Sequence, residues 1–383
     1  MNWRRLAPAG DRVVYRPGAG SAVCGLFAPW HATLLGSGTQ ALGATLLALK
    51  RDAPGRDEVI FAAYNCPALV SATVYAGCRP ILIDYVPERP WMDLSQLAAR
   101  LSTRTLAVVA VDFLGIPERH GELRALCRAA RCTLVQDAAQ AFPSRAGERV
   151  WQGDVVVLSF GRGKPVSLLA GGAVLARDRA LGKAVARLGE QRPFGRWQHG
   201  LRVAAYNLLR RPLLYGIPAA VPALRLGETR FVPLDGIDAM PEPLAASLPA
   251  AVEAFRRVRS PQGLYAGVLA QGPWTDLATL CRHRGEERLA RYPVLAADAA
   301  TAQRVRRALV HWGVSGLYGA ALPEVQGVAG HLVERAAFPR AEDFAARLVT
   351  LPTHEGVTAR QAVRIARALH DDNPGKELAE AEA

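Results

Sequence analysis

Residues 106–137 read LAVVAVDFLGIPERHGELRALCRAARCTLVQD, and the order of apolar and polar residues in this stretch decides the fold class. The apolar run 106–111 predicts a buried strand, the segment 118–130 a helix, and the run 133–137 a second buried strand. Buried strands joined by helices are typical of parallel sheets covered on both faces. Ligands of such sheets bind beyond the carboxyl ends of the strands.

The same alternation continues on both sides of this stretch. Further strands are predicted at 58–62, 80–84, 154–160 and 172–176, and further helices at 39–50, 67–76 and 94–101. From residue 240 helical or mixed segments dominate, at 246–259, 263–292, 301–312 and 359–369, with a strand at 292–297. We therefore predict an α/β large domain over 1–240, a smaller α+β domain over 241–372 and a mobile tail over 373–383.

The composition excludes several classes of protein. Of 383 residues 50% are hydrophobic and 21% are charged, a balance typical of globular chains rather than disordered ones. The start carries no secretory signal, and the charge-free apolar stretch 212–224 is too short to span a bilayer and contains two internal prolines, so a cytoplasmic location is expected. The six cysteines form no C-x-x-C pair, so we expect no metal site.

Lysine is rare in this chain. Of 47 basic residues only Lys50, Lys164, Lys183 and Lys376 are lysine. Lys164 follows the strand 154–160 on a loop that begins Gly-Arg-Gly. An imine needs a primary amine that can lose its proton, which arginine cannot supply, so this lysine is a candidate for covalent chemistry with a carbonyl group.

The segment Gly36-Ser37-Gly38-Thr39-Gln40-Ala41 opens a predicted helix and fits the loose dinucleotide pattern G-x-G-x-x-[G/A]. A nicotinamide site would also need a strand before this segment and an acidic residue at the end of the strand that follows the helix. Residues 27–35 make a poor strand because Pro29 lies inside, and Asp57 precedes the next strand. The segment therefore indicates either an anion site at a helix start or an ordinary capped helix.

Asp137 closes an apolar strand and is followed by small residues, so its carboxylate either caps a helix or faces a ligand. Pyridoxal phosphate (PLP) requires three groups together beyond the strand ends: a helix start that binds an anion, which we name the anion cradle, a carboxylate and a lysine. The cradle would hold the phosphate, Asp137 the protonated ring nitrogen, and Lys164 the aldehyde. We therefore predict PLP as the cofactor.

Several motifs resemble those of the DegT/DnrJ/EryC1/StrS aminotransferases. The matching segments are Ser37-Gly38-Thr39-Gln40-Ala41-Leu42, Asp57-Glu58-Val59-Ile60, Tyr75-Ala76-Gly77, Gln136-Asp137-Ala138-Ala139-Gln140-Ala141, Leu158-Ser159-Phe160 with Lys164, Tyr292-Pro293-Val294, and residues 351–358. The resemblance implies the aspartate aminotransferase fold (PLP fold type I), a homodimer with the active site at the subunit interface, and amination of keto-sugars attached to nucleotides.

Residue roles follow from the same resemblance. It implies that Lys164 holds the cofactor as an imine and moves protons, that Asp137 pairs with the ring nitrogen, and that Gln140 faces the ring hydroxyl. The phosphate would be held by Ser37, Gly38, Thr39 and Ser159. Some relatives carry histidine in place of the lysine and act as dehydratases, so the lysine favours amino transfer.

The chain also departs from this family. Cys66 stands where the family stacks an aromatic side chain on the cofactor ring, so either Tyr64 stacks there or the ring packs on sulfur. The family's Gly-Tyr-Asn-Tyr-Arg segment is not recognisable between residues 231 and 240. Tyr318 falls where relatives place residues near the substrate, but its neighbours match poorly.

Residues 191–227 are strongly basic. They contain six arginines, no Asp or Glu, and four aromatic residues, Phe194, Trp197, Tyr206 and Tyr215. Three interpretations are open: a packed insertion, peripheral contact with an anionic membrane, or binding of a diphosphate. No nucleic-acid-binding module accompanies the segment, so nucleic acid is not an expected partner.

The function predicted from the sequence is therefore transfer of an amino group from glutamate to a keto-sugar, for surface polysaccharide, glycolipid or secondary-metabolite synthesis. The nucleotide link and the sugar rest on the resemblance. The alternatives are another PLP reaction on the same fold, such as a lyase, a dehydratase or transamination of a non-sugar ketone, and a catalytically degenerate binding protein at a membrane.

Overall fold

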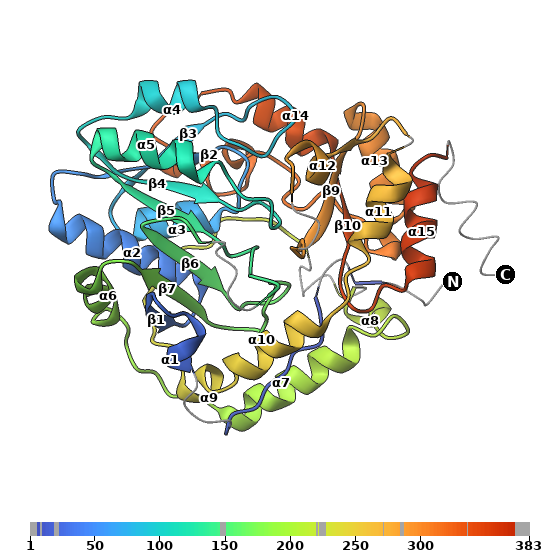
Figure 1. Ribbon diagram of the computed structural model, residues 1–383, viewed down its shortest axis with the longest axis horizontal. Coiled ribbons are helices and arrows are strands. Elements are labelled where there is room, and N and C mark those ends of the chain that lie inside the picture. Colours follow the sequence, from blue (N-terminus) through green and yellow to red (C-terminus); the bar gives the residue numbers. More distant parts are fainter. Residues whose placement is uncertain are drawn as a thin grey trace.

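The computed structural model describes residues 6, 7, 10–18, 23–145, 151–219, 221, 227–270, 272–283, 287–334 and 336–371. The tail expected over 373–383 lies outside these residues. A central sheet with helices on both faces forms one side of the molecule, and a smaller sheet with its own helices forms the other (Figure 1).

The large sheet has seven strands in the order β1-β7-β6-β5-β4-β2-β3. The strands are β1 (His31–Leu35), β2 (Glu58–Ala62), β3 (Arg79–Ile83), β4 (Thr105–Val111), β5 (Thr133–Asp137), β6 (Val155–Ser159) and β7 (Gly172–Ala176). β7 runs antiparallel to both of its neighbours, and the other pairs are parallel. The expectation of a mostly parallel sheet is confirmed, and six strands end at the same edge.

Side chains of each strand alternate between two apolar cores. On β6, Val155 and Val157 belong to one core, while Val156 and Leu158 belong to the other. The first core lies under α2 and α3 and the second under α10. The helices of this part are α1 (Val23–Leu26), α2 (Gly38–Asp52), α3 (Ala68–Tyr75), α4 (Leu94–Arg100), α5 (His120–Ala130), α6 (Arg179–Ala186), α7 (Arg196–Leu209), α8 (Gly216–Ala219), α9 (Glu242–Ala245) and α10 (Leu248–Arg257).

The sequence analysis was wrong about residues 27–35. Pro29 lies before the strand, and His31–Leu35 forms β1, which pairs along its whole length with β7. β1 lies at the edge of the sheet, and its burial rises from exposed His31 to buried Leu35. An edge strand needs no continuous apolar run, which is why its sequence gave a weak signal.

The smaller sheet has the order β10-β9-β8 and is antiparallel. Its elements are α11 (Gln262–Leu269), β8 (Thr275–Asp276), α12 (Leu277–Leu280), β9 (Arg291–Leu295), α13 (Ala299–Ala308), α14 (Pro339–Arg347), β10 (Leu348–Pro352) and α15 (Ala359–Ala368), with short 3-10 turns at Val310–Trp312, Leu322–Glu324 and Ala329–His331. α9 and α10, which the sequence analysis placed in the small domain, pack on the large sheet through Leu244, Leu248 and Phe255.

The described part of the N-terminal segment lies between the two sheets and α7. The backbone N–H of Leu6 donates to the carbonyl of His311 at 2.8 Å, and the Asp11 carboxylate pairs with Arg288 at 2.6 Å. Val13 exchanges two hydrogen bonds of 2.9 Å with the side-chain amide of Asn207 on α7. This segment therefore ties α7 to the small domain.

A cluster of aromatic rings joins α14 of the small domain to the large sheet. Phe344 on α14 is 2% exposed, and its ring centroid lies 5.5 Å from Tyr64, 5.1 Å from Tyr85 and 5.8 Å from Phe113. The contacts with Tyr85 and Phe113 are edge-to-face, a geometry that stabilises beyond the apolar area that the rings bury.

We predict that Phe344→Ala lowers the free energy of unfolding by about 3–5 kcal/mol, because it leaves a cavity among three buried rings. Urea denaturation followed by circular dichroism measures the change. Leu264→Ala is the control, because Leu264 is 39% exposed and its replacement should lower the free energy of unfolding much less. Equal losses in the two variants would contradict the prediction.

Candidate active site

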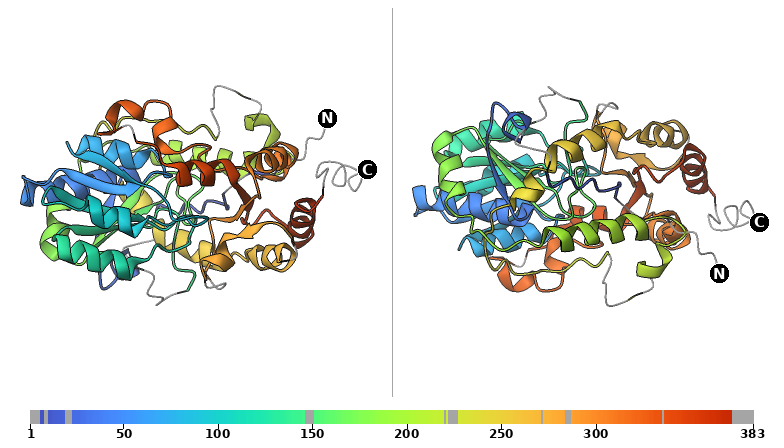
Figure 2. Two further views of the ribbon diagram at one scale, coloured as in Figure 1. Left: turned by 90° about the horizontal axis from the view of Figure 1, so that it is seen from above. Right: turned by 90° about the horizontal axis from the view of Figure 1, so that it is seen from below.

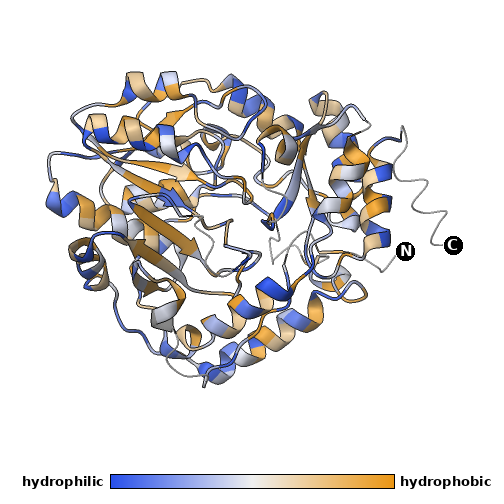
Figure 3. Ribbon diagram, in the orientation of Figure 1, coloured by the Kyte–Doolittle hydropathy of each residue, from blue (hydrophilic) through white to orange (hydrophobic). Residues whose placement is uncertain are grey.

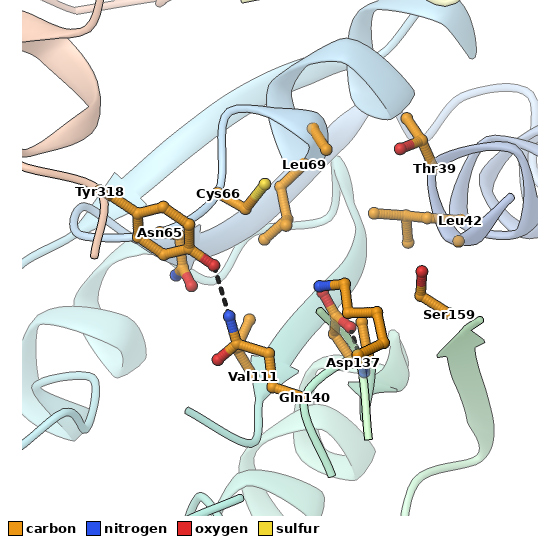
Figure 4. Close-up of a pocket in the computed structure, with 14 residues that line it drawn as sticks. Thr39, Leu42, Asn65, Cys66, Leu69, Val111, Asp137, Gln140, Ser159 and Tyr318 are labelled. Carbon is orange, nitrogen blue, oxygen red and sulfur yellow. Dashed lines mark hydrogen bonds between the residues drawn. The ribbon is translucent and has the colours of Figure 1, made fainter. Parts of the chain in front are cut away.

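A pocket opens beyond the edge where six strands of the large sheet end (Figure 4). Seven of the residues predicted from the sequence line it: Gly38, Thr39, Cys66, Asp137, Gln140, Ser159 and Lys164. Its empty volume is about 630 Å³, a figure that includes the open mouth. The sheet thus gathers side chains that lie up to 126 positions apart in sequence.

Lys164 lies on the loop that connects β6 to β7. Its backbone N–H donates to the carbonyl of Gly161 at 3.3 Å, and Gly163 between them takes a φ of 74°, a left-handed conformation that favours glycine. Further along, the carbonyl of Leu168 accepts a hydrogen bond from Nε2 of His199 on α7 at 3.0 Å. The loop is therefore held at both ends, which fixes where the lysine side chain can reach.

Asp137 is the last residue of β5 and is 7% exposed. One carboxylate oxygen accepts a hydrogen bond of 2.9 Å from the backbone N–H of Ala139. Burial raises the pKa of Asp137, while that hydrogen bond and the nearby charge of Lys164 act in the opposite direction. A buried carboxylate beside an amine is suited to hold a positively charged group of a ligand.

A second buried acid lies behind Asp137 and was missed in the sequence analysis. Asp112, just after β4, accepts a hydrogen bond of 2.6 Å from the side-chain amide of Gln136 and lies 2.7 Å from Nε2 of His120. Burial lowers the pKa of His120, but the Asp112 carboxylate outweighs it and the pKa is raised. No motif links these residues in sequence, so only their spacing around two strand ends could have pointed to them.

Gln140 connects the pocket to the small domain. Its side-chain oxygen accepts from the backbone N–H of Leu114 at 2.7 Å, and its amide donates to the hydroxyl of Tyr318 at 2.6 Å (Figure 4). The sequence analysis gave Tyr318 little weight, yet its ring forms one wall of the pocket. The interaction joins the two domains across the site.

Cys66 and Tyr64 take different positions. The sulfur of Cys66 lines the pocket, and burial raises the pKa of its thiol. Tyr64 is fully buried beneath the pocket, and its hydroxyl donates to the carbonyl of Gly316 at 3.1 Å. Tyr64 therefore does not line the pocket, and of the two alternatives for contact with a bound ring the geometry favours Cys66.

The start of α2 lies on the other side of the pocket. Ser37 caps this helix by accepting from the N–H of Gln40 at 3.1 Å, so its hydroxyl serves the helix rather than the pocket. A Cβ on Gly38 would lie 2.7 Å from Cβ of Ser159, so only glycine leaves this space open. The free N–H groups of the first turn and the hydroxyls of Thr39 and Ser159 then face one small volume.

This fold is that of the aspartate aminotransferase class. The structure of Helicobacter pylori PseC, an aminotransferase involved in the biosynthesis of pseudoaminic acid, matches with a TM-score of 0.70 at 17% identity, over 95% of this chain and 98% of that one. DesI, solved in the presence of its TDP-sugar product, matches with a TM-score of 0.69 at 21% identity, over 100% of this chain and 97% of that one. These likenesses confirm the expected fold.

Sequence comparison matches part of the chain to a family. Residues 21–207 match the DegT/DnrJ/EryC1/StrS aminotransferase family, which confirms the resemblance over this part of the chain. GDP-perosamine synthase of Escherichia coli O157:H7 is 31% identical over 153 residues, which are 39% of this chain and 42% of that protein. The alignment thus covers less than half of this relative. The residues that match the family, 21–207, lie within the large domain predicted over 1–240.

We predict that Asp137→Asn stabilises the ligand-free protein at neutral pH. Because burial raises the pKa of Asp137, the native state binds its proton more tightly than the unfolded chain does. The free energy of unfolding therefore falls as the pH rises above the unfolded value of about 4, and the amide avoids this loss.

Urea denaturation across the acid and neutral range measures this difference, which should vanish below about pH 4. Asp235→Asn is the control, because Asp235 is exposed on a loop. An Asp137→Asn protein less stable than the wild type at neutral pH would contradict the prediction.

Proposed function

We propose that this chain is a PLP-dependent aminotransferase. The observation that carries the proposal is the presence in one pocket of the Lys164 amine, the buried Asp137 carboxylate and the anion cradle at the start of α2. When bound, PLP supplies a ring that takes up the electrons left when a bond to the amino-bearing carbon breaks. The space that Gly38 leaves beside Ser159 fits the cofactor's phosphate.

The chain's own residues then have distinct tasks. The N–H groups at the start of α2, with Thr39 and Ser159, would bind the phosphate. Asp137 would keep the proton on the ring nitrogen, because its buried carboxylate gains an ionic partner there. Lys164 would hold the aldehyde, and its amine would carry a proton between the substrate carbon and the cofactor carbon.

Glutamate is the proposed amino donor, and Arg288 is the residue we propose to receive its carboxylate. Arg288 lines a smaller pocket together with Gly163 and Lys164. One of its Nη atoms pairs with Asp11, while Nη1 is buried without a hydrogen-bond partner among the described residues. A guanidinium with one free edge near the lysine is suited to bind a carboxylate.

The proposed acceptor is a keto-sugar linked to a nucleotide. Support comes from the family and from the named relatives, among them DesI with its TDP-sugar product and GDP-perosamine synthase. Another PLP reaction on this fold and a non-catalytic binding role are the competing functions. The homodimer and the cytoplasmic location expected from the sequence stay predictions.

The test of the function is formation of 2-oxoglutarate from glutamate by the purified protein with PLP. Lys164→Ala should lose the activity together with the visible absorption band that PLP acquires on the wild-type protein. Lys183→Ala is the matched control, because Lys183 is exposed on α6. A band that forms without 2-oxoglutarate would favour a lyase or dehydratase, and no Lys164-dependent band would favour the binding role.

The donor site has its own prediction. Arg288→Gln should raise the KM for glutamate by about one to two orders of magnitude, because a hydrogen bond to a charged group contributes about 1.5–3 kcal/mol. PLP binding, read from the absorption band, should persist. Arg257→Gln is the control, since the Arg257 side chain is 76% exposed on α10. An unchanged KM in Arg288→Gln would exclude the residue from the donor site.

A further inference from the structure

The outer face of α7 is apolar. Trp197, Leu201 and Leu208 follow one another at intervals of four and seven residues, which places them on one side of the helix. They are 79%, 72% and 49% exposed. A helix that lies on a protein surface normally turns polar side chains toward water, so this orientation is unusual.

The exposed apolar residues are concentrated in this region. Of the ten large apolar side chains exposed in the described residues, six form what we name the α7–α8 surface: Trp197, Leu201, Leu208, Leu213, Ile217 and Val221. Figure 2 shows α7 in front of the other elements in the view from below, and Figure 3 shows apolar residues along it. Exposed apolar side chains concentrated in one region in this way mark interaction sites.

The packing of α7 on its own domain does not use this face. The opposite side of the helix carries the buried residues His199 and Val203, and Asn207 on that side holds the N-terminal segment. The interpretation of residues 191–227 as a packed insertion therefore accounts for the inner face of α7 and leaves the outer face unexplained.

Unpaired positive charge borders the apolar face. Arg196, Arg202 and Arg211 are exposed and form no ion pair within the described residues, whereas Arg192 and Arg210 pair with Asp238 and Glu355. The sequence from 191 to 227 contains no Asp or Glu. The charge at this surface is thus positive without local compensation.

These features distinguish between two occupants. A second copy of the chain that used this same surface in a two-fold contact would bring two positively charged patches together, because such contacts use one patch twice. A bilayer with anionic lipids offers phosphates to the arginines and an apolar layer to the tryptophan and leucines. α7 has 14 residues, fewer than the roughly 20 needed to cross a bilayer, so it would lie in the plane of the membrane surface.

We propose that the α7–α8 surface docks on an anionic lipid membrane. α7 would lie with Trp197 and Leu201 in the lipid interface, and the bordering arginines would contact the headgroups. Since His199 on the inner face bonds to the loop that follows Lys164, docking would also place the pocket close to the bilayer.

Co-sedimentation of the full chain with vesicles tests this proposal. The wild type should bind vesicles of phosphatidylcholine with phosphatidylglycerol at low salt and should not bind phosphatidylcholine alone. Leu201→Glu should abolish binding, and each of Arg196→Gln, Arg202→Gln and Arg211→Gln should weaken it about fivefold. Val232→Glu is the matched control, because Val232 is 56% exposed outside the surface and this variant should bind as the wild type does.

Two results would overturn the proposal. One is the absence of binding to the anionic vesicles at low salt. The other is a fall in molecular mass from dimer to monomer on Leu201→Glu, measured by light scattering, which would assign the surface to a second copy of the chain. Activity on soluble substrates should be unchanged in Leu201→Glu, since Leu201 does not line the pocket.

Discussion

The site depends on a carboxylate that is buried at the end of a strand. An ionised acid in apolar surroundings is costly unless charge or hydrogen bonds compensate it. Asp137 receives one backbone hydrogen bond and the field of Lys164, and yet its pKa remains raised. The protein alone therefore does not fully offset the cost of burying the ionised Asp137 carboxylate. A ligand that places a positive charge beside this carboxylate would offset the remainder.

The surroundings of this acid are ordered by further buried polar groups. The Asp112 carboxylate forms hydrogen bonds with the Gln136 amide and the His120 ring. The backbone N–H of Asp112 donates to the carbonyl of Asp137 at 3.0 Å. Gln140 links the same region to Tyr318 of the small domain. The pocket is thus held by hydrogen bonds from both domains, so its shape depends on how they are placed.

Much of this could be predicted from the sequence. Apolar runs predicted the strands from β2 to β7 because both of their faces are buried. Short motifs predicted seven pocket residues because these lie within five residues of a strand end or a helix start. β1 was missed because an edge strand is half exposed. Arg288, and Tyr318, to which the sequence analysis gave little weight, come from the small domain. Only the tertiary packing brings Tyr318 to this pocket and Arg288 to the smaller one beside Lys164.

The N-terminal segment has a consequence for the order of events during synthesis. Its described residues form hydrogen bonds with Asn207 and His311 and an ion pair with Arg288. These three partners leave the ribosome long after the segment itself. The strands of the large sheet can pair as they emerge, whereas the segment must wait until most of the chain has been made. Docking of the first part of the chain is therefore a late step, and it joins α7 to the small domain.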